Sequence, residues 1–255
     1  MIDIQKVKEE FNKYVQNFDV ADDKIKLKKE HIERVAILSK MIAQDLNLND
    51  EQILLAEVIG YFHDIGRFKQ VEEYDTFNDK VSINHAEYSI KVLFEDKLIE
   101  KFDIEEKYFD IIKKAVLNHN KDNIEEGLTD KEMLFAKIIR DADKLDIYYV
   151  ICNYELESVF WSDKFDVEKI NDKVMREFKE EHKLNYNDIK NNADQILTFY
   201  AFVFDFNFDI SKRYLKGKGY LDYFAKRLET GFSSDAVKIR LKEVLQIANE
   251  YLQKY

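Results

Sequence analysis

Proline is absent from this 255-residue sequence, and glycine occurs only six times. These two residue types most often interrupt helices and mark turns, so their scarcity favours helices joined by polar turns. Hydrophobic residues make up 45% of the chain, which is enough for a substantial core. The composition therefore excludes a disordered chain and favours an all-α globular fold.

Cysteine is almost as scarce, since Cys152 is the only one. A single cysteine excludes an internal disulfide and a thiolate metal cluster, and it fits a reduced, cytoplasmic setting. The first residues lack the apolar region of a signal peptide. The most apolar stretch, residues 198–208, contains Asp205 and is shorter than the about 20 residues that a membrane span needs. We therefore expect a soluble cytoplasmic protein with no membrane partner.

Positive charge is also in short supply, because 51 acidic residues outweigh 40 basic ones and give a net charge of −11. No segment carries a Lys/Arg-rich stripe, so binding to a nucleic-acid backbone is disfavoured. A local cationic pocket for a small phosphorylated substrate remains compatible with this charge. The sequence does not indicate an oligomeric state.

Hydrophobic periodicity predicts a series of helices. Apolar residues recur at three- and four-residue steps behind His31, and residues 51–63 are apolar on nearly every side, which is typical of a helix in the middle of a core. We expect Gly66 to end that helix and residues 67–84 to form a long loop. Further helices are expected over residues 85–95, 108–117 and 131–149, the last with a capping box of Thr129 and Glu132. Residues 1–153 are expected to form one domain, with residues 154–255 as a helical extension packed on it.

Four of the five histidines lie at the starts or ends of these predicted helices: His31, His63, His85 and His119. Imidazole and carboxylate groups suit divalent Mn, Fe, Co, Ni or Zn, and helix ends can bring such ligands together. The adjacent Asp64 closes the most apolar helix, where a carboxylate is costly to bury unless it is paired or bound to a cation.

Structural roles are the alternative for the same residues. His63 can be a core histidine, with Asp64 interacting with Arg67 at the helix end. His85 and His119 can be polar caps.

The order of these residues resembles the HD superfamily of metal-dependent phosphohydrolases. The resemblance rests on His31, HDIGR at residues 63–67, His85, His119 and DADKLD at residues 141–146. No motif of the family lies beyond residue 153.

The resemblance implies an all-α HD-domain bundle in which His31, His63, Asp64 and an aspartate of the last motif bind a metal ion. His85 and His119 match the extra histidines of members that hold two metals bridged by the HD aspartate. One or two divalent ions are therefore expected, with Mg also possible.

The last carboxylate ligand can be Asp143 or Asp141. Residues two apart on a helix point about 200° apart, so both are not expected to face one metal. In the family the ligand usually stands in an A-D-x-L pattern, and residues 142–145 match it. We expect Asp143 to be the ligand, with Asp141 in reserve.

The activity that the resemblance implies is hydrolysis of a small phosphate ester, such as a nucleotide, a cyclic nucleotide or a phosphomonoester, by a metal-activated water. Asp64 would orient that water. Arg67 resembles the basic residue often found after the HD pair and would bind the substrate phosphate, with Arg34 and Lys144 as further candidates. Each of these cations can instead be an ordinary solvated charge on a helix.

Two other functions remain open on the same residues. Some HD proteins with this ligand pattern hold two irons and use dioxygen to cleave C–C or C–P bonds. A non-catalytic ligand sensor could retain the helical shell without the chemistry. The aromatic run over residues 199–208 can stack a substrate base or simply form core.

Overall fold

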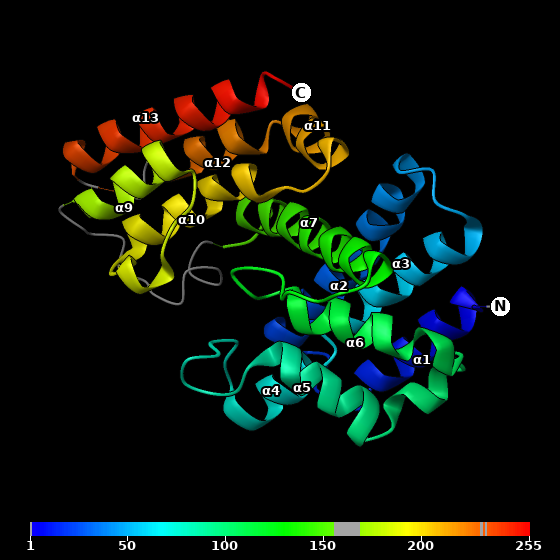
Figure 1. Cartoon of the computed structure of the whole chain (residues 1–255). Helices are drawn as coiled ribbons and strands as arrows, with labels where there is room; N and C mark the ends of the chain where they lie inside the picture. Colours follow the sequence, from blue (N-terminus) through cyan, green and yellow to red (C-terminus); the bar gives the residue numbers. More distant parts are fainter. Residues whose placement is uncertain (1, 156–168, 230–231, 233) are drawn as a thin grey trace. The chain divides into compact units, whose positions relative to one another are not determined.

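The computed structural model describes residues 2–155, 169–229, 232 and 234–255. Every regular element among these residues is helical and none is a strand, which confirms the all-α prediction (Figure 1). The chain divides into two compact units, residues 1–146 and 147–255. The packing of an extension over residues 154–255 on the first domain stays a prediction, and residues 156–168 of that extension lie outside the described residues.

The first unit contains the helices that carry the histidines. Its elements are α1 (Ile4–Val15), α2 (Asp23–Asp45), α3 (Asp50–Phe62), α4 (Arg67–Tyr74), α5 (His85–Ile90), α6 (Phe109–Asn118) and most of α7 (Asp130–Asn153). A π-helical turn (Lys91–Glu95) and two 3-10 turns (Leu98–Phe102 and Glu106–Tyr108) connect α5 to α6.

Side-chain caps begin three of the helices that carry or adjoin the candidate ligands. Asn49 and Gln52 form a capping box at the start of α3, and the Asn84 side chain accepts from two backbone amides at the start of α5. The predicted box of Thr129 and Glu132 is present at the start of α7. Such caps satisfy amides that have no partner within the helix and are worth about 1 kcal/mol each. They fix where α3, α5 and α7 begin.

Helices α2 and α3 approach each other closely. A Cβ built on Gly60 would lie 2.4 Å from the backbone Cα of Ala36. Only glycine allows the two backbones to come this near. Because α2 carries His31 and α3 ends just before His63, this approach sets the distance between the two histidines.

Residues 67–84 were predicted as one long loop, and this prediction is wrong for the first half, because α4 covers Arg67–Tyr74. The helix forms around Phe68, which is fully buried against Phe11 and Phe18. Two buried apolar residues, Phe68 and Val71, are too few to show a period in the sequence, and tertiary packing supplies the stabilisation instead.

Gly66 was expected to end the preceding helix, but α3 ends at Phe62 and Gly66 is the N-cap of α4. A Cβ on Gly66 would lie 2.5 Å from the Ser89 backbone nitrogen. This glycine therefore serves close packing against α5 and not a left-handed helix end.

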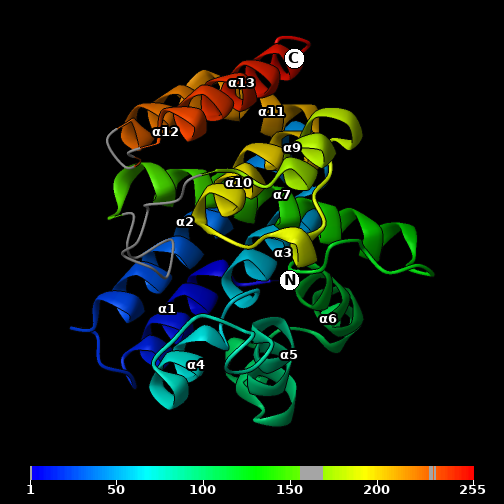
Figure 2. The same ribbon diagram turned by 90° about the vertical axis from the view of Figure 1, so that its left-hand side faces the viewer.

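The second unit is also helical. Its elements are α9 (Asp172–Arg176), a π-helical turn (Glu177–Glu181), a 3-10 turn (Tyr186–Asp188), α10 (Asn192–Asp205), α11 (Asp209–Lys218), α12 (Tyr220–Leu228) and α13 (Asp235–Leu252). α13 runs alongside α12 in both views (Figures 1 and 2). In the aromatic run, Tyr200 is fully buried and stacks on Phe224 with the ring centroids 5.4 Å apart. Much of this run therefore forms core. Among the described residues, no helix is both long enough and apolar enough to cross a bilayer.

The contact between α2 and α3 can be tested with a single methyl group. Gly60→Ala should lower the free energy of unfolding by about 1–3 kcal/mol, because the added carbon meets backbone that cannot move aside. The matched control is Gly217→Ala, because no atom lies within 4 Å of a Cβ there. The control should leave stability unchanged or raise it by up to about 1 kcal/mol. Urea denaturation of both variants measures the difference, and equal midpoints would contradict this account of Gly60.

Candidate metal centre

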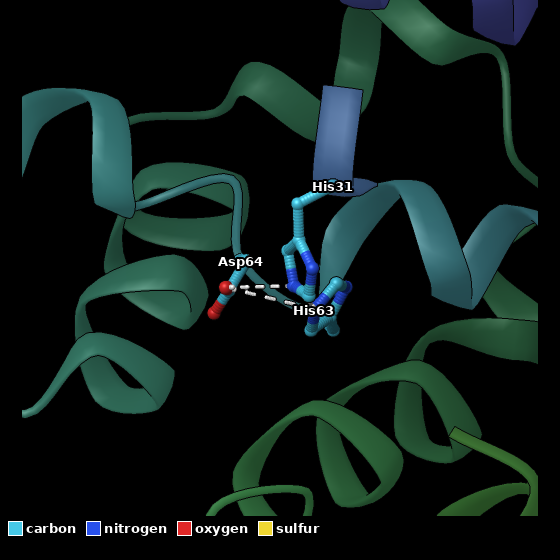
Figure 3. A group of neighbouring side chains, drawn as sticks. All are labelled: His31, His63 and Asp64. Carbon is cyan, nitrogen blue, oxygen red and sulfur yellow. Dashed lines mark hydrogen bonds and ion pairs between the residues drawn. The ribbon is translucent and has the colours of Figure 1, made fainter. Parts of the chain in front are cut away.

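Three helices and the turn after α3 bring four histidines around one aspartate. His31 lies within α2, His85 begins α5, and His119 follows α6, while His63 and Asp64 follow α3 directly. Figure 3 shows the His31 and His63 side chains pointing toward the Asp64 carboxylate. The four histidines and Asp64 are all buried, with exposed fractions of 8% or less.

The two oxygens of Asp64 face different histidine pairs. Oδ2 lies 3.6 Å from Nε2 of His31 and 3.6 Å from Nε2 of His63. Oδ1 lies 3.5 Å from Nε2 of His85 and 3.4 Å from Nε2 of His119. The arrangement therefore has two halves that share one carboxylate. We call the His31 and His63 side the first half-site and the His85 and His119 side the second half-site.

The other ring nitrogen of each of these four histidines is held by an acceptor. Nδ1 of His63 donates to the Gly60 carbonyl oxygen at 2.8 Å, and Nδ1 of His119 donates to the Val116 carbonyl oxygen at 2.6 Å. His31 Nδ1 and His85 Nδ1 donate to the carboxylates of Asp146 and Asp79. Since carbonyl and carboxylate oxygens only accept, Nδ1 carries a proton in each ring, and a neutral ring therefore offers the lone pair of its Nε2.

The four Nε2 atoms thus face one another and Asp64. His31 Nε2 lies 3.3 Å from His63 Nε2, and His85 Nε2 lies 3.0 Å from His119 Nε2. Asp64 Oδ1 is buried and has no hydrogen-bond partner. Burying a carboxylate oxygen among acceptors is unfavourable unless a cation lies between them. The donor set therefore fits divalent metal ions in both half-sites, with Asp64 between the two.

Asp143 adds a second carboxylate to the first half-site. Its Oδ1 lies 3.2 Å from His31 Nε2 and 3.8 Å from His63 Nε2. Asp141 is fully buried, but among the described residues it belongs to none of the groups whose ligand atoms converge within 4.8 Å. The geometry thus favours Asp143 over Asp141, although the ligand role itself stays a prediction.

Burial and charge set the protonation of these groups. Burial above all lowers the pKa of His63 to about 3 and that of His85 to about 4, so both rings are neutral near pH 7, as metal binding requires. Burial by itself would raise the pKa of Asp64. Lys28 and the neighbouring histidines outweigh this effect and hold the pKa well below its ordinary value. Burial and Lys28 lower the pKa of His31, yet hydrogen bonds with Asp143, Asp146 and Asp64 raise it to about 10, so a metal ion at its Nε2 would have to displace a proton.

Sequence reasoning missed three charged residues that contact the centre. Lys28 Nζ lies 2.7 Å from Asp64 Oδ2 and is largely buried. Asp146 and Asp79 hold the Nδ1 atoms of His31 and His85, as described above. Lys28 precedes His31 by three residues and so shares its helix face, a signal that the sequence does contain. No local pattern links Asp146 to His31, which lies 115 residues away.

The three cations proposed for a substrate phosphate lie in different surroundings. Arg67 is close to the centre, with Nε 3.7 Å from Asp64 Oδ1. Arg34 binds both oxygens of Asp146, at 2.6 and 3.0 Å, and so supports the carboxylate behind His31. Lys144 is buried on α7, with 7% of its surface exposed.

A buried cluster of histidine and aspartate ligands within an all-α bundle defines a candidate divalent-metal protein. Residues 29–148 match the family described as HD domain, and this stretch contains all the proposed ligands. The chain therefore contains an HD domain over residues 29–148, as the ordered motifs predicted. No curated protein and no solved structure matches the chain.

Metal removal should destabilise the protein. A metal ion at 100 times its Kd stabilises a folded protein by about 2.7 kcal/mol, which corresponds to a rise in Tm of roughly 5–10 °C for a chain of this size. We expect a chelator to lower the Tm of the wild-type protein by that amount and to remove bound metal, as measured by elemental analysis.

His63→Ala should bind less metal and respond less to the chelator, because it removes a proposed ligand of the first half-site. His182→Asn is the matched control, since His182 is exposed, lies outside the centre and has a φ of 53° that asparagine tolerates. If the wild-type protein contained no metal and the chelator did not change its Tm, the proposed metal centre would be wrong.

Proposed function

We propose that this protein is a metal-dependent phosphohydrolase that cleaves a small phosphate ester with a metal-activated water. The observation that carries the proposal is the Asp64 carboxylate, whose two oxygens each face a separate pair of histidine Nε2 atoms. This geometry supports two metal ions that share one carboxylate, the arrangement used to activate water and to neutralise charge on a phosphoryl group. The HD family is generally one of metal-dependent hydrolases, which favours the same chemistry.

The proposed ligands of the first half-site are His31, His63, Asp64 and Asp143, and those of the second are His85, His119 and Asp64. Bound divalent ions would lower the pKa of a coordinated water and offset the negative charge that develops on the phosphoryl oxygens. The chain's own part is to hold the imidazole rings in one orientation, and Asp64 would orient the attacking water.

Arg67 is the strongest candidate for contact with the substrate phosphate. Its Nη1 donates to the Gln70 side chain at 2.7 Å, to the Phe77 carbonyl at 2.6 Å and to Asp79 at 2.9 Å, which fixes the guanidinium plane. Its Nε is buried and has no hydrogen-bond partner, although it lies beside Asp64. A phosphoryl oxygen at the metal centre would satisfy this donor.

The other assignments support the same function less directly. Arg34 would act through Asp146 on His31, because both its contacts with Asp146 are already made. A substrate role for Lys144 stays a prediction. The acidic net charge favours a small phosphate over a nucleic acid as partner, and the single cysteine favours a cytoplasmic location.

A substrate screen tests the function. Nucleotides, cyclic nucleotides and phosphomonoesters are incubated with the protein and Mn, Co, Ni, Mg or Fe, and released phosphate or the cleaved ester is measured. We expect turnover with at least one metal. The double variant His31→Ala, Asp143→Ala should lose about a hundredfold or more in rate, because the metal's charge contributes several kcal/mol.

His182→Asn should keep the wild-type rate in the same screen. Full activity in the double variant would show that the assigned centre does not perform the reaction.

The six proposed ligands also favour a second candidate function, that of a di-iron oxygenase. Assays with and without oxygen distinguish the two functions. A hydrolase should turn over under argon with Mn or Co, whereas an oxygenase should need iron and consume oxygen. A protein that binds a ligand but holds no metal would instead support a non-catalytic sensor.

A further inference from the structure

The two half-sites differ in what supports their histidines. Each half-site has one ring held by a backbone carbonyl and one held by a carboxylate. In the first half-site the carboxylate is Asp146, whose side chain is 1% exposed and which Arg34 also binds. In the second half-site the carboxylate is Asp79, whose side chain is 29% exposed.

Asp79 belongs to the loop between α4 and α5, residues 75–84. Its Oδ2 accepts from both Nδ1 and the backbone amide of His85, so one loop residue orients the ring and the start of α5. Its Oδ1 accepts from Arg67 Nη1 at 2.9 Å and from Gln70 Nε2 at 3.0 Å. The same carboxylate therefore joins a proposed metal ligand to the proposed phosphate-binding arginine.

The remaining contacts of the loop converge on the same place. Gln70 is fully buried, and its Nε2 also donates to Ser82 Oγ at 2.9 Å and to the Ile83 carbonyl at 3.1 Å. The Phe77 ring lies 5.1 Å from Lys28 Nζ and 5.6 Å from the Arg67 guanidinium. Lys28 on α2 and Arg67 on α4, which lie against the Phe77 ring, also contact Asp64.

We propose that the loop over residues 75–84 is part of the second half-site, and that Asp79 couples its closure to metal binding by His85, His119 and Asp64. A metal at His85 Nε2 makes Nδ1–H a stronger donor, and Asp79 makes Nε2 a better ligand in return. By reciprocity, the closed loop raises metal affinity by the same factor by which the metal favours loop closure. The metal ion of the second half-site is then the one that exchanges with solution. Its binding favours the closed loop, in which Asp79 holds Arg67 in place for the substrate.

Metal titration of the stripped full-length protein tests this coupling. This inference rests on the two-metal site of the proposed function, but the titration needs no substrate, so a failed activity screen leaves it readable. Mn²⁺ alone is titrated and followed by calorimetry. We expect two binding events in the wild-type protein, one abolished by His31→Ala and the other by His85→Ala.

Asp79→Asn should weaken the event that His85→Ala abolishes by about 10–100-fold and leave the other within about twofold. Asp146→Asn should do the reverse. Asp75→Asn is the matched control in the same loop, because Asp75 pairs only with Lys24 among the described ion pairs and has a φ of 54° that asparagine tolerates. It should leave both events unchanged.

Limited proteolysis provides a second measurement of the same coupling. Lys80 is exposed within the loop, so trypsin can cut after it when the loop opens. Saturating Mn²⁺ should slow that cut in the wild-type protein at least tenfold and should not protect it in Asp79→Asn.

The coupling is overturned by a single binding event that survives His85→Ala, by equal weakening of both events in Asp79→Asn, or by cleavage at Lys80 that ignores Mn²⁺.

Discussion

The structure depends on one buried carboxylate at the centre of four histidines. Four imidazole Nε2 atoms face the Asp64 oxygens, and the Nδ1 proton of each ring is donated to an acceptor on its other side. Among the described ion pairs of Asp64 with cationic side chains, Lys28 reaches Oδ2 and Arg67 Nε lies 3.7 Å from Oδ1. The cluster therefore favours binding of further positive charge, and the surrounding helices hold the Nε2 atoms and the Asp64 oxygens at fixed distances from one another.

Those distances follow from backbone contacts some way from the centre. α3 can approach α2 closely because Gly60 has no side chain to meet Ala36, and the Gly60 carbonyl also holds the His63 ring. α5 can approach the turn after α3 because Gly66 has none to meet Ser89. Two glycines thus determine how near His63 and Asp64 lie to the histidines of other helices. A centre of this kind is intolerant of small shifts, because ligand distances and directions must all be met together.

Local sequence patterns predicted much of the fold and of the site. The apolar residues 51–63, the capping box of Thr129 and the absence of proline were sufficient for the all-α architecture and for the helices nearest the histidines. The sequence did not predict α4, because the stability of this helix comes from packing of Phe68 against aromatic rings of α1 and not from a repeating pattern of its own. The hydrogen-bond partners of the histidine Nδ1 atoms were also not predicted, since such a partner does not produce a periodic pattern in the sequence.

The sequence by itself determined the chemistry available to this protein. It supplies four histidines and several aspartates in the order typical of the HD superfamily, with no thiolate cluster or basic stripe as an alternative. Only the tertiary structure decided how the ligands and their supporting residues are distributed between the two half-sites. It brings Asp143 rather than Asp141 to the histidines, assigns each Asp64 oxygen to one pair, and places Asp146 behind one half-site and a loop aspartate behind the other. The physical reason is that residue type and spacing act within a helix, whereas these contacts join residues up to 115 positions apart and exist only once the helices have packed.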